Sequence, residues 1–284
     1  MIGFNFLASP GQLGNQMFKY SALRGIAENN NQDFMIPPSY LKFEKYSLPY
    51  KIATKYLIPR NKQNHFLFDC FEMISVQKKN IGYLESDHQV KERYFHFDEN
   101  IFNSRLADYD ISGFFQTEKY FKNVEDIIRS DFKFKKSIDI KAEKLISKFN
   151  SPISIHIRRG DYITNPNHEA LNLKYYEESI NLFQSNDTFL VFSDDVDWCK
   201  QQSLFIDNKF NFASDLTNNF DYLDMCLMSK CNKHIIANST FSWWGAWLSG
   251  SNDVIAPSKW FKNSKYSKNN TKDLYPPEWQ TVEN

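Results

Sequence analysis

The sequence predicts an α/β protein built on parallel sheets, and two observations lead to this class. An apolar stretch over residues 2–8 leads through a glycine-containing loop at residues 11–16 into a helical period from Met17 to Ile26. From residue 153 onward, short apolar runs alternate with helical segments. Both patterns are typical of doubly wound folds, in which helices cover the two faces of a parallel sheet.

The length of 284 residues favours two domains over one. We expect an N-terminal domain over residues 1–150 and a C-terminal domain over residues 151–265, because strand and helix alternation begins again after Ser151-Pro152. Residues 266–284 form a tail that we expect to pack back on the body. The aromatic residues after Pro257 that support this are Trp260, Phe261, Tyr266, Tyr275 and Trp279.

In the first domain, a second strand is expected over residues 110–116 and a helix over residues 124–130. Residues 37–103 carry scattered aromatics and prolines without a sustained period, so an irregular region is expected there. The lysine-rich residues 133–148 suit a solvated helix or a connector. In the second domain, the expected strands cover residues 153–157, 189–192, 234–237 and 254–256, and the expected helices residues 174–183, 223–228 and 238–248, the last after a short loop.

Lysine plus arginine equals aspartate plus glutamate at 34 each, so no global charge attracts nucleic acid or an anionic membrane. The four cysteines show no CxxC pair and no metal-ligand spacing, which indicates reduced thiols. Neither a signal peptide nor a membrane-spanning segment is recognisable. We therefore expect a cytoplasmic protein without a membrane anchor, either free or peripheral at the inner face of the membrane.

The segment His156-Ile157-Arg158-Arg159-Gly160-Asp161 carries the strongest functional signal. It places two guanidinium groups and an imidazole where a predicted buried strand ends, which is where open α/β sheets bind ligands. Planar guanidinium groups match the geometry of phosphate oxygens. The alternative is a surface salt bridge among Arg158, Arg159 and Asp161.

Polar residues follow other predicted strands as well. Gly11, Gly14 and Asn15 could place backbone amides and a side-chain amide around a phosphate at a helix N-terminus, or simply form a turn. The loop GQLGNQ matches neither GxGxxG nor the P-loop, so neither a nicotinamide enzyme nor a P-loop kinase is supported.

Ser193, Asp194 and Asp195 could accept hydrogen bonds from a base or ribose, or could cap a helix. A further run of small donors opens a helix after residue 237 and suits an anion; the alternative is capping by Ser239 or Thr240, with the tryptophans in the core. The run consists of Asn238, Ser239, Thr240, Phe241 and Ser242.

Two DxD triplets, at residues 108–110 and 195–197, match a pattern with which many sugar transferases hold a divalent ion. Such short acidic patterns arise often by chance. Because two arginines are available to neutralise a diphosphate, we expect no metal.

Several segments together resemble the α-1,2-fucosyltransferases, the GDP-fucose-dependent glycosyltransferase family 11. They are GQLGNQMFKY, GFFQTEKYF, HIRRGDY, FSDD and NSTFSWWGAWL, in the family's order and approximate spacing, with coverage from Gly11 to Trp279. The family commonly has GGLGNQ in the first segment, where this chain has Gln12 in place of the second glycine. The resemblance implies a GT-B architecture of two Rossmann-like domains facing across a cleft, with GDP-fucose held mainly by the second.

The resemblance also implies residue roles. Arg158 would contact the β-phosphate and stabilise the leaving GDP, Arg159 and His156 would support the same pocket, and Asp161 would orient an arginine. The remaining implied ligand residues are Ser193, Asp194 and Asp195 near guanine or ribose, Asn238, Ser239, Thr240, Phe241 and Ser242 near the diphosphate, and Gly14 and Asn15 reaching in from the first domain.

The implied reaction is metal-independent inverting transfer of L-fucose from GDP-β-L-fucose to the 2-hydroxyl of a terminal β-galactoside, in an oligosaccharide or bacterial surface glycan. Fixed cations that bind the diphosphate would give the largest stabilisation of the transition state. No spacing identifies a general base among Asp161, His168 and Glu169. His96 and Gln116 are candidates for acceptor binding.

Two other functions fit parts of the sequence. One is an inverting transferase of the same fold that uses another GDP-sugar or makes another linkage. The other is a non-catalytic carbohydrate-binding protein, which the abundant Trp and Tyr would suit but which has no need of paired arginines at a strand end.

Overall fold

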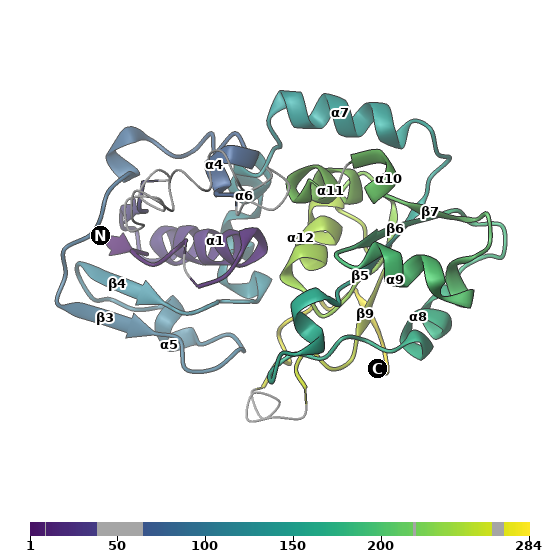
Figure 1. Ribbon diagram of the computed structural model, residues 1–284. Coiled ribbons are helices and arrows are strands. Elements are labelled where there is room, and N and C mark those ends of the chain that lie inside the picture. The colour runs from purple at the N-terminus through teal and green to yellow at the C-terminus, as the bar shows by residue number, and fades with distance from the viewer. Residues whose placement is uncertain (9, 39–64, 218–219, 263–269) are drawn as a thin grey trace, which may run out of the picture. The chain divides into compact units, whose positions relative to one another are not determined.

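The computed structural model describes residues 1–8, 10–38, 65–217, 220–262 and 270–284 (Figure 1). The chain divides into two compact units: unit 1 comprises residues 1–135 and 270–276, and unit 2 comprises residues 136–269 and 277–284. The division thus falls before helix α7 (Lys136–Ile146), not at residues 150/151 as the sequence suggested. The reason is that α7 contacts α11 (Asp221–Met228) of unit 2.

Unit 1 is built on a parallel sheet with the order β2-β1-β4-β3. Its strands are β1 (Ile2–Gly3), β2 (Phe34–Met35), β3 (His88–Lys91) and β4 (Tyr109–Ser112), and its α-helices are α1 (Leu13–Asn29), α4 (Leu67–Cys70), α5 (Glu99–Phe102) and α6 (Glu125–Asp131). Short 3₁₀ helices cover Lys78–Asn80, Glu118–Tyr120 and Lys122–Val124. The predicted opening of strand, loop and helix is confirmed.

Both predicted strands of this unit are shorter than expected. The prediction over residues 2–8 is wrong after Gly3, because the Asn5 side chain bonds Leu84 through both its amide atoms, at 2.9 and 3.0 Å, in place of a strand ladder. The prediction over residues 110–116 is wrong after Ser112, because Phe115 adopts a φ of 52°, which no strand accommodates.

The region predicted as irregular, residues 37–103, contains regular elements where it is described. The edge strand β3 was missed because its residues are mostly exposed and polar, so they show neither alternation nor an apolar run. The rest of that prediction, residues 39–64 with Pro49 and Pro59, lies outside the described residues.

Helix α1 packs against the backbone of residues 120–121 through Gly25. A Cβ atom at Gly25 would lie 1.8 Å from the Tyr120 carbonyl oxygen. We expect Gly25→Ala to destabilise unit 1 by roughly 3 kcal/mol, because backbone has to shift and core contacts are lost. Thermal unfolding measures this, with Gly82→Ala as the matched control, since only the flexible Met35 side chain lies near that position. An unchanged melting temperature for Gly25→Ala would contradict the close packing.

Unit 2 is a second parallel sheet, with the order β10-β9-β8-β5-β6-β7. Its strands are β5 (Ile153–Ile157), β6 (Phe189–Ser193), β7 (Phe210–Phe212), β8 (Lys233–Ile235), β9 (Val254–Pro257) and β10 (Gln280–Val282). Besides α7 and α11, its α-helices are α8 (Leu173–Ile180), α9 (Val196–Gln201), α10 (Ser214–Thr217) and α12 (Thr240–Ser249), and 3₁₀ helices cover Gly160–Ile163 and Ser203–Phe205.

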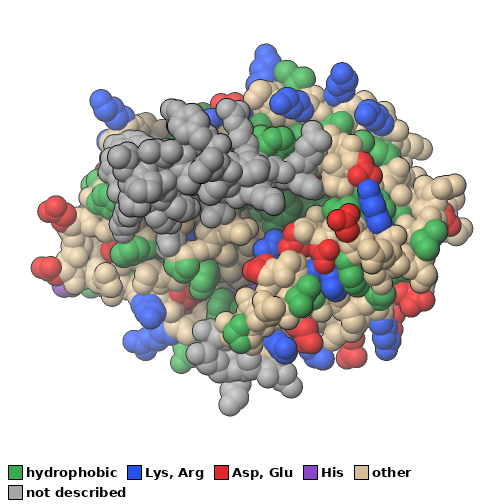
Figure 2. Space-filling view, viewed as in Figure 1, with side chains coloured by type: hydrophobic (Ala, Val, Ile, Leu, Met, Phe, Trp, Pro, Cys, Tyr) green, Lys and Arg blue, Asp and Glu red, His purple; other side chains and the backbone are tan. Residues whose placement is uncertain are grey.

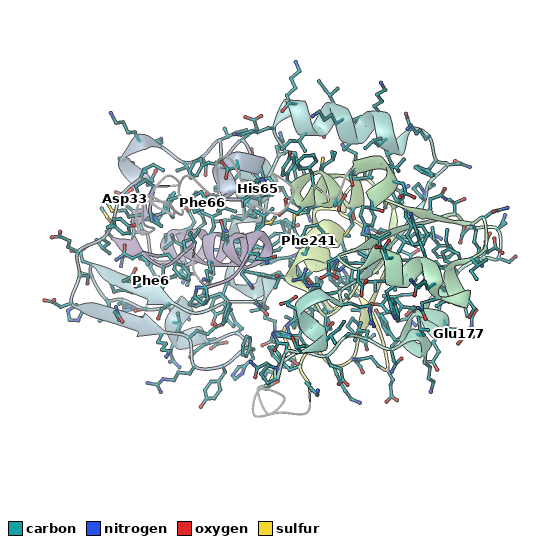
Figure 3. All side chains as sticks on the ribbon, viewed as in Figure 1. Phe6, Asp33, His65, Phe66, Glu177 and Phe241 are labelled. Atoms are coloured by element: carbon teal, nitrogen blue, oxygen red, sulfur yellow. The ribbon has the colours of Figure 1, made fainter. Side chains whose placement is uncertain are left out.

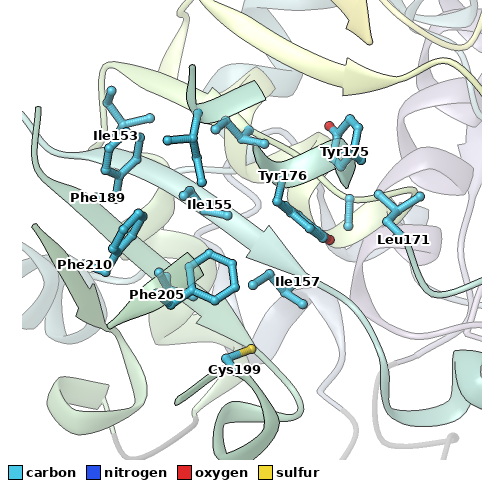
Figure 4. Packing of buried hydrophobic residues seen from close by; sticks show 14 of the residues in the cluster. Ile153, Ile155, Ile157, Leu171, Tyr175, Tyr176, Phe189, Cys199, Phe205 and Phe210 are labelled. Carbon is cyan, nitrogen blue, oxygen red and sulfur yellow. The ribbon is translucent and has the colours of Figure 1, made fainter. Parts of the chain in front are cut away.

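Both faces of this sheet are buried. On one face, Ile155 and Ile157 of β5 pack with Tyr176 of α8 and Cys199 of α9 (Figure 4). On the other face, residues such as Leu190 of β6 pack with residues of α7, α10 and α11. The continuous apolar strands are explained by this doubly wound arrangement, which confirms the predicted fold class.

All the strands predicted for the second half are present, within two residues at their ends, and β7 and β10 are additional. The tail does pack back, but in two parts. Asp273 of residues 270–276 accepts hydrogen bonds from the Phe97 amide and Lys119 Nζ of unit 1. Residues 277–284 belong to unit 2, where β10 extends the sheet and the Trp279 ring lies 5.4 Å from Trp243. Tyr266 lies outside the described residues.

Candidate active site

The candidate site of unit 2 lies where the strand order reverses. From β5 the chain continues through β6 and β7 on one side, then returns to build β8, β9 and β10 on the other. Ligands of such sheets bind beyond the carboxyl ends of the two strands at this switch point. His156, Arg158 and Arg159 belong to β5 or follow it directly, and Asn238 to Ser242 follow β8.

Arg158 is held by carboxylates. Its Nη2 donates to Asp161 Oδ1 at 2.6 Å, and its Nη1 lies 3.1 Å from Asp194 Oδ2. Its guanidinium carbon lies 5.5 Å from the centre of the Tyr162 ring. A Cβ atom at Gly160 would lie 2.5 Å from Asp194 Oδ2, so glycine there leaves room for the carboxylate. The expected contact between Asp161 and Arg158 is therefore present in the fold, and the contact between Asp194 and Arg158 was not predicted.

Arg159 is engaged within the protein. Its Nε lies 3.2 Å from Asp195 Oδ2, and its guanidinium stacks 3.6 Å from the Trp198 ring. Its backbone amide donates to Asp194 Oδ1 at 2.8 Å. A guanidinium held on an aromatic face by a carboxylate supports the loop after β5.

Ser193 and Asp195 act at the N-terminus of α9. Asp195 Oδ1 accepts from the Trp198 amide, and the Asp195 amide donates to Ser193 Oγ at 3.0 Å. The capping interpretation is thus observed. A contact to guanine or ribose stays a prediction for these residues.

The arginine cluster has two positive and three negative side chains, Asp161, Asp194 and Asp195, a formal net charge of −1. Asp161 is the most exposed of the three, with 59% of its side chain accessible, and it occupies donors of Arg158 that a phosphate would use. Asp161 therefore competes with any anion at Arg158.

We expect Asp161→Asn to tighten GDP binding about two- to fivefold at low salt, because an exposed ion pair of this kind contributes about 0.2–1 kcal/mol. Titration calorimetry measures the dissociation constant, and Asp197→Asn, a change at a nearby exposed carboxylate, is the control. Weaker GDP binding in Asp161→Asn would show that the carboxylate is needed to orient Arg158 more than it obstructs it.

His156 is buried in β5, 5% exposed, and its ring lies 5.4 Å from that of Phe241 at the start of α12. Burial, with a smaller effect of Arg158, lowers its pKa to about 3, so the imidazole is neutral. No partner for Nδ1 is found among the described residues. This ring nitrogen is therefore able to form one hydrogen bond with a ligand.

Asn238 connects the loops around the switch point. Its side-chain Nδ2 donates to the backbone carbonyl oxygens of Glu169 and Trp260, at 3.1 Å each. The backbone carbonyl oxygen of Asn238 accepts from Tyr162 Oη at 3.1 Å. Its Oδ1 is buried without a partner among the described residues. The side chain thus fixes three loops and presents one unused acceptor.

The N-terminus of α12 has no side-chain cap. Ser239 is the N-cap residue, yet its hydroxyl accepts no amide, so the expected capping by Ser239 is not found. Ser242 Oγ turns back onto the Ala237 and Ser239 carbonyl oxygens. Amides of the first turn at Thr240, Phe241 and Ser242 have no intrahelical partners, as in any helix, so this end can bind an anion. Phe241 is labelled at this point in Figure 3.

The predicted residues of unit 1 have contacts within their own unit. Gly14 and Asn15 are in the first turn of α1, and Gln116 Nε2 donates to Asn15 Oδ1 at 2.9 Å. His96 stacks on Tyr94 at 5.2 Å.

Aspartates of the two DxD segments form hydrogen bonds and ion pairs within their own units. Asp108 binds the N-terminal amine at 2.9 Å, Asp110 accepts from the Asn5 amide, and Asp195 caps α9. Among the described residues, no three His, Cys, Asp or Glu side chains gather as a metal ion would require. Metal independence stays a prediction.

Sequence reasoning missed Trp198 and the role of Tyr162. Trp198 has no local signal, because only the fold brings it to Arg159. Tyr162 lies within the recognised segment, and its hydroxyl bond to residue 238 is a tertiary contact.

Lysine, arginine, aspartate and glutamate side chains are all found on the surface. Figure 2 shows basic and acidic side chains interspersed on the face in view. In the part of the chain that the structure describes, no helix is long and apolar enough to cross a bilayer.

Two Rossmann-like parallel units, one with an arginine cluster at its switch point, define the GT-B class of glycosyltransferases. The family profile described as Glycosyl transferase family 11 matches residues 2–283. The chain therefore belongs to glycosyltransferase family 11, and its activity is glycosyl transfer.

Known proteins agree with this assignment. The chain is 31% identical to an α-1,2-colitosyltransferase of Escherichia coli, over 96% of this chain and 97% of that protein. It is 23% identical to galactoside α-(1,2)-fucosyltransferase 1 of Bos taurus, over 95% of this chain and 73% of that protein. The fold resembles the crystal structure of fucosyltransferase NodZ from Bradyrhizobium, with a TM-score of 0.51 at 14% identity, covering 87% of this chain and 92% of that one.

Proposed function

We propose that this protein transfers L-fucose from GDP-β-L-fucose, with inversion, to the 2-hydroxyl of a terminal β-galactoside in a glycan. The observation that carries the proposal is the pairing of Arg158 after β5 with the uncapped N-terminus of α12 after β8, at one switch point. A fixed guanidinium and a helix N-terminus are together suited to a diphosphate.

The chemistry follows from this placement. As the bond between fucose C1 and the β-phosphate oxygen breaks, the electron pair stays on GDP, where Arg158 and the α12 amides stabilise it. The sugar becomes oxocarbenium-like, and an acceptor hydroxyl attacks its opposite face, so the β-linked donor gives an α-linked product. The hydroxyl proton leaves late in this attack and goes to solvent water.

The neighbouring side chains have supporting roles in the proposal. His156 is neutral and buried. It therefore suits a hydrogen bond to the nucleoside and not an ion pair with a phosphate. Ser193, Asp194 and Asp195 suit guanine or ribose. Asp161 holds Arg158 through the 2.6 Å contact until the diphosphate takes its place.

None of Asp161, His168 and Glu169 has contacts that identify it as the general base. Asp161 is engaged with Arg158. His168 stacks on the Tyr162 ring at 4.6 Å, and burial lowers its pKa, so its imidazole is unprotonated at neutral pH but is a weaker base. Glu169 is tied through its backbone to Asn238.

A second donor has support from the relatives, since one of them, 31% identical, is named a colitosyltransferase. Colitose is fucose without the 3-hydroxyl, so GDP-colitose would present the same diphosphate and nearly the same sugar. A site that hydrogen-bonds the 3-hydroxyl of fucose discriminates against the deoxy sugar by about 10⁴–10⁵.

We also propose a cytoplasmic location. Cys199, Cys226 and Cys231 are free and buried, which suits a reducing compartment.

The test is GDP release from GDP-fucose, GDP-colitose and GDP-mannose, with and without lactose, in excess EDTA. We expect lactose to stimulate release from GDP-fucose and not from GDP-mannose. Faster turnover of GDP-colitose would assign the second donor. Release that requires an added divalent ion would contradict metal independence, and the absence of release from all three donors would contradict the proposed function.

A further inference from the structure

A pair of side-chain amides meets at the carboxyl edge of the unit 1 sheet. The strand order β2-β1-β4-β3 reverses between β1 and β4. Asn15 lies in the first turn of α1, the helix that follows β1, and Gln116 lies in the loop after β4. Unit 1 therefore has a switch point of its own, occupied by polar and uncharged groups.

The bond between the two amides fixes what they offer to a ligand. Gln116 Nε2 donates to Asn15 Oδ1 at 2.9 Å, which leaves Asn15 Nδ2 as a donor and Gln116 Oε1 as an acceptor. Gln116 is only 6% exposed, and its Oε1 has no partner among the described residues. A buried acceptor without a donor is costly, so a bound hydroxyl would stabilise it.

The adjacent helix end is also open. No side chain caps α1 at Gln12, and no acidic residue lies in the first turn. Amides at this end can therefore donate to a ligand oxygen, next to the amide pair.

Two charged side chains, the buried Lys19 and the half-buried Glu92, hold the loops that carry this site. Lys19 Nζ donates to the Pro10 carbonyl oxygen at 2.7 Å and to that of Phe6 at 3.4 Å. Glu92 accepts from the Phe114 and Phe115 amides at 2.6 and 3.0 Å. Burial lowers the pKa of Lys19 to about 8 and raises that of Glu92 to about 7. Because both charges bind backbone atoms, neither is available to attract a charged ligand.

The loop after β4 is held in a strained conformation. Phe115 has a φ of 52°, which is unfavourable for an aromatic residue, and its amide is one of those bound by Glu92. Backbone strain of this kind persists where the surroundings enforce it and is frequent at ligand sites. Here it sets the direction of the next residue, Gln116.

The two loops that lead to Asn15 and Gln116 also carry aromatic residues. Phe6, labelled in Figure 3, lies in the loop after β1 and is 50% exposed. Phe114 stacks against Phe95, with 6.1 Å between ring centres. Phe6 lies in the loop that leads into α1, and Phe114 lies in the loop that carries Gln116. Aromatic faces and uncharged amides on the same two loops suit a neutral sugar, whose ring has apolar faces and hydroxyl edges.

We propose that the Asn15–Gln116 amide pair binds hydroxyl groups of a neutral sugar, the terminal β-galactoside of the acceptor, and that Lys19 and Glu92 are positioning residues for it. This inference rests on the proposed function for the identity of the sugar. It gives Asn15 a different ligand from the nucleotide that the sequence resemblance implied.

The test uses the full chain with Gln116→Met, which keeps the length of the side chain and removes both polar atoms. The matched control is Gln89→Met, at an exposed position of β3. We expect the acceptor KM to rise at least tenfold in Gln116→Met, with the GDP dissociation constant within twofold of wild type. An unchanged KM, or a GDP affinity that falls in step with the KM, would overturn the proposal.

Positioning by Glu92 has its own readout. Glu92→Gln keeps an acceptor oxygen for the loop amides, and Glu92→Ala does not. We expect Glu92→Ala to raise the acceptor KM and Glu92→Gln to restore most of it. Equal KM values in the two variants would overturn the positioning role.

Saturation-transfer NMR with methyl β-galactoside, in the presence of saturating GDP, separates this inference from the proposed function. Galactoside binding by wild type that is lost in Gln116→Met supports the site even if no transfer from GDP-fucose is observed. Binding that survives in a folded Gln116→Met protein, or no binding by wild type, overturns the site. If Gln116→Met fails to fold, Asn15→Ala takes its place with the same expected outcomes.

Discussion

Arg158→Ala should lower kcat at least ~10²-fold while the protein stays folded. Removing one fixed donor from a developing negative charge costs about 2.7–4 kcal/mol in the transition state. Arg158 sits at the end of β5, and its partners Asp161 and Asp194 orient it without burying it completely, since 22% of the side chain is exposed. The measurement is GDP release at saturating donor and acceptor.

Two companion variants sharpen this expectation. Arg158→Lys should recover only part of the rate, because an ammonium group keeps the charge and loses the planar fork. Arg105→Ala, at an exposed arginine of unit 1, should change nothing. A folded Arg158→Ala protein with a near-normal kcat would refute the assigned role of the guanidinium.

Asn238→Asp should have the largest effect on stability of any isosteric change near the site. The Asn238 side chain is buried, and its Nδ2 donates to the Glu169 and Trp260 carbonyl oxygens. A carboxylate would place oxygen against oxygen at both contacts, so we expect a loss of about 3 kcal/mol in the free energy of unfolding of unit 2. Urea denaturation monitored by tryptophan fluorescence measures it.

The same substitution should weaken GDP binding, because a negative charge would lie one residue before the N-cap of α12. Asn186→Asp, at an exposed position of the same unit, is the control and should leave both quantities unchanged. Stability equal to wild type in Asn238→Asp would mean that this side chain does not fix the loops around the switch point.

The sequence predicted the position in the fold of those candidate residues that lie in one continuous segment. HIRRGDY lies at the end of a buried strand, as its apolar run followed by Gly160 predicted. The donors after β8 were found for the same reason. Both depend on local pattern, which periodicity and strand-end chemistry can detect.

Contacts between distant segments were beyond such patterns. Asp194 joins Arg158 to the Arg159 backbone, and Trp198 supports the Arg159 guanidinium, because β5 and β6 are neighbours in the sheet. The polar edge strand β3 has no apolar period, and β10 is defined only by its pairing with β9. Lys19 and Glu92 have the pattern of ordinary surface charges in the sequence, and only the fold shows that both bind backbone atoms.

The central claim is that the diphosphate of a GDP-sugar binds at the switch point of unit 2, and a crystal structure of the GDP complex tests it most directly. The account predicts the β-phosphate at about 3 Å from an Arg158 Nη atom and from an amide in the first turn of α12. Phosphates bound elsewhere, with Arg158 still paired to Asp161 and Asp194, would contradict it.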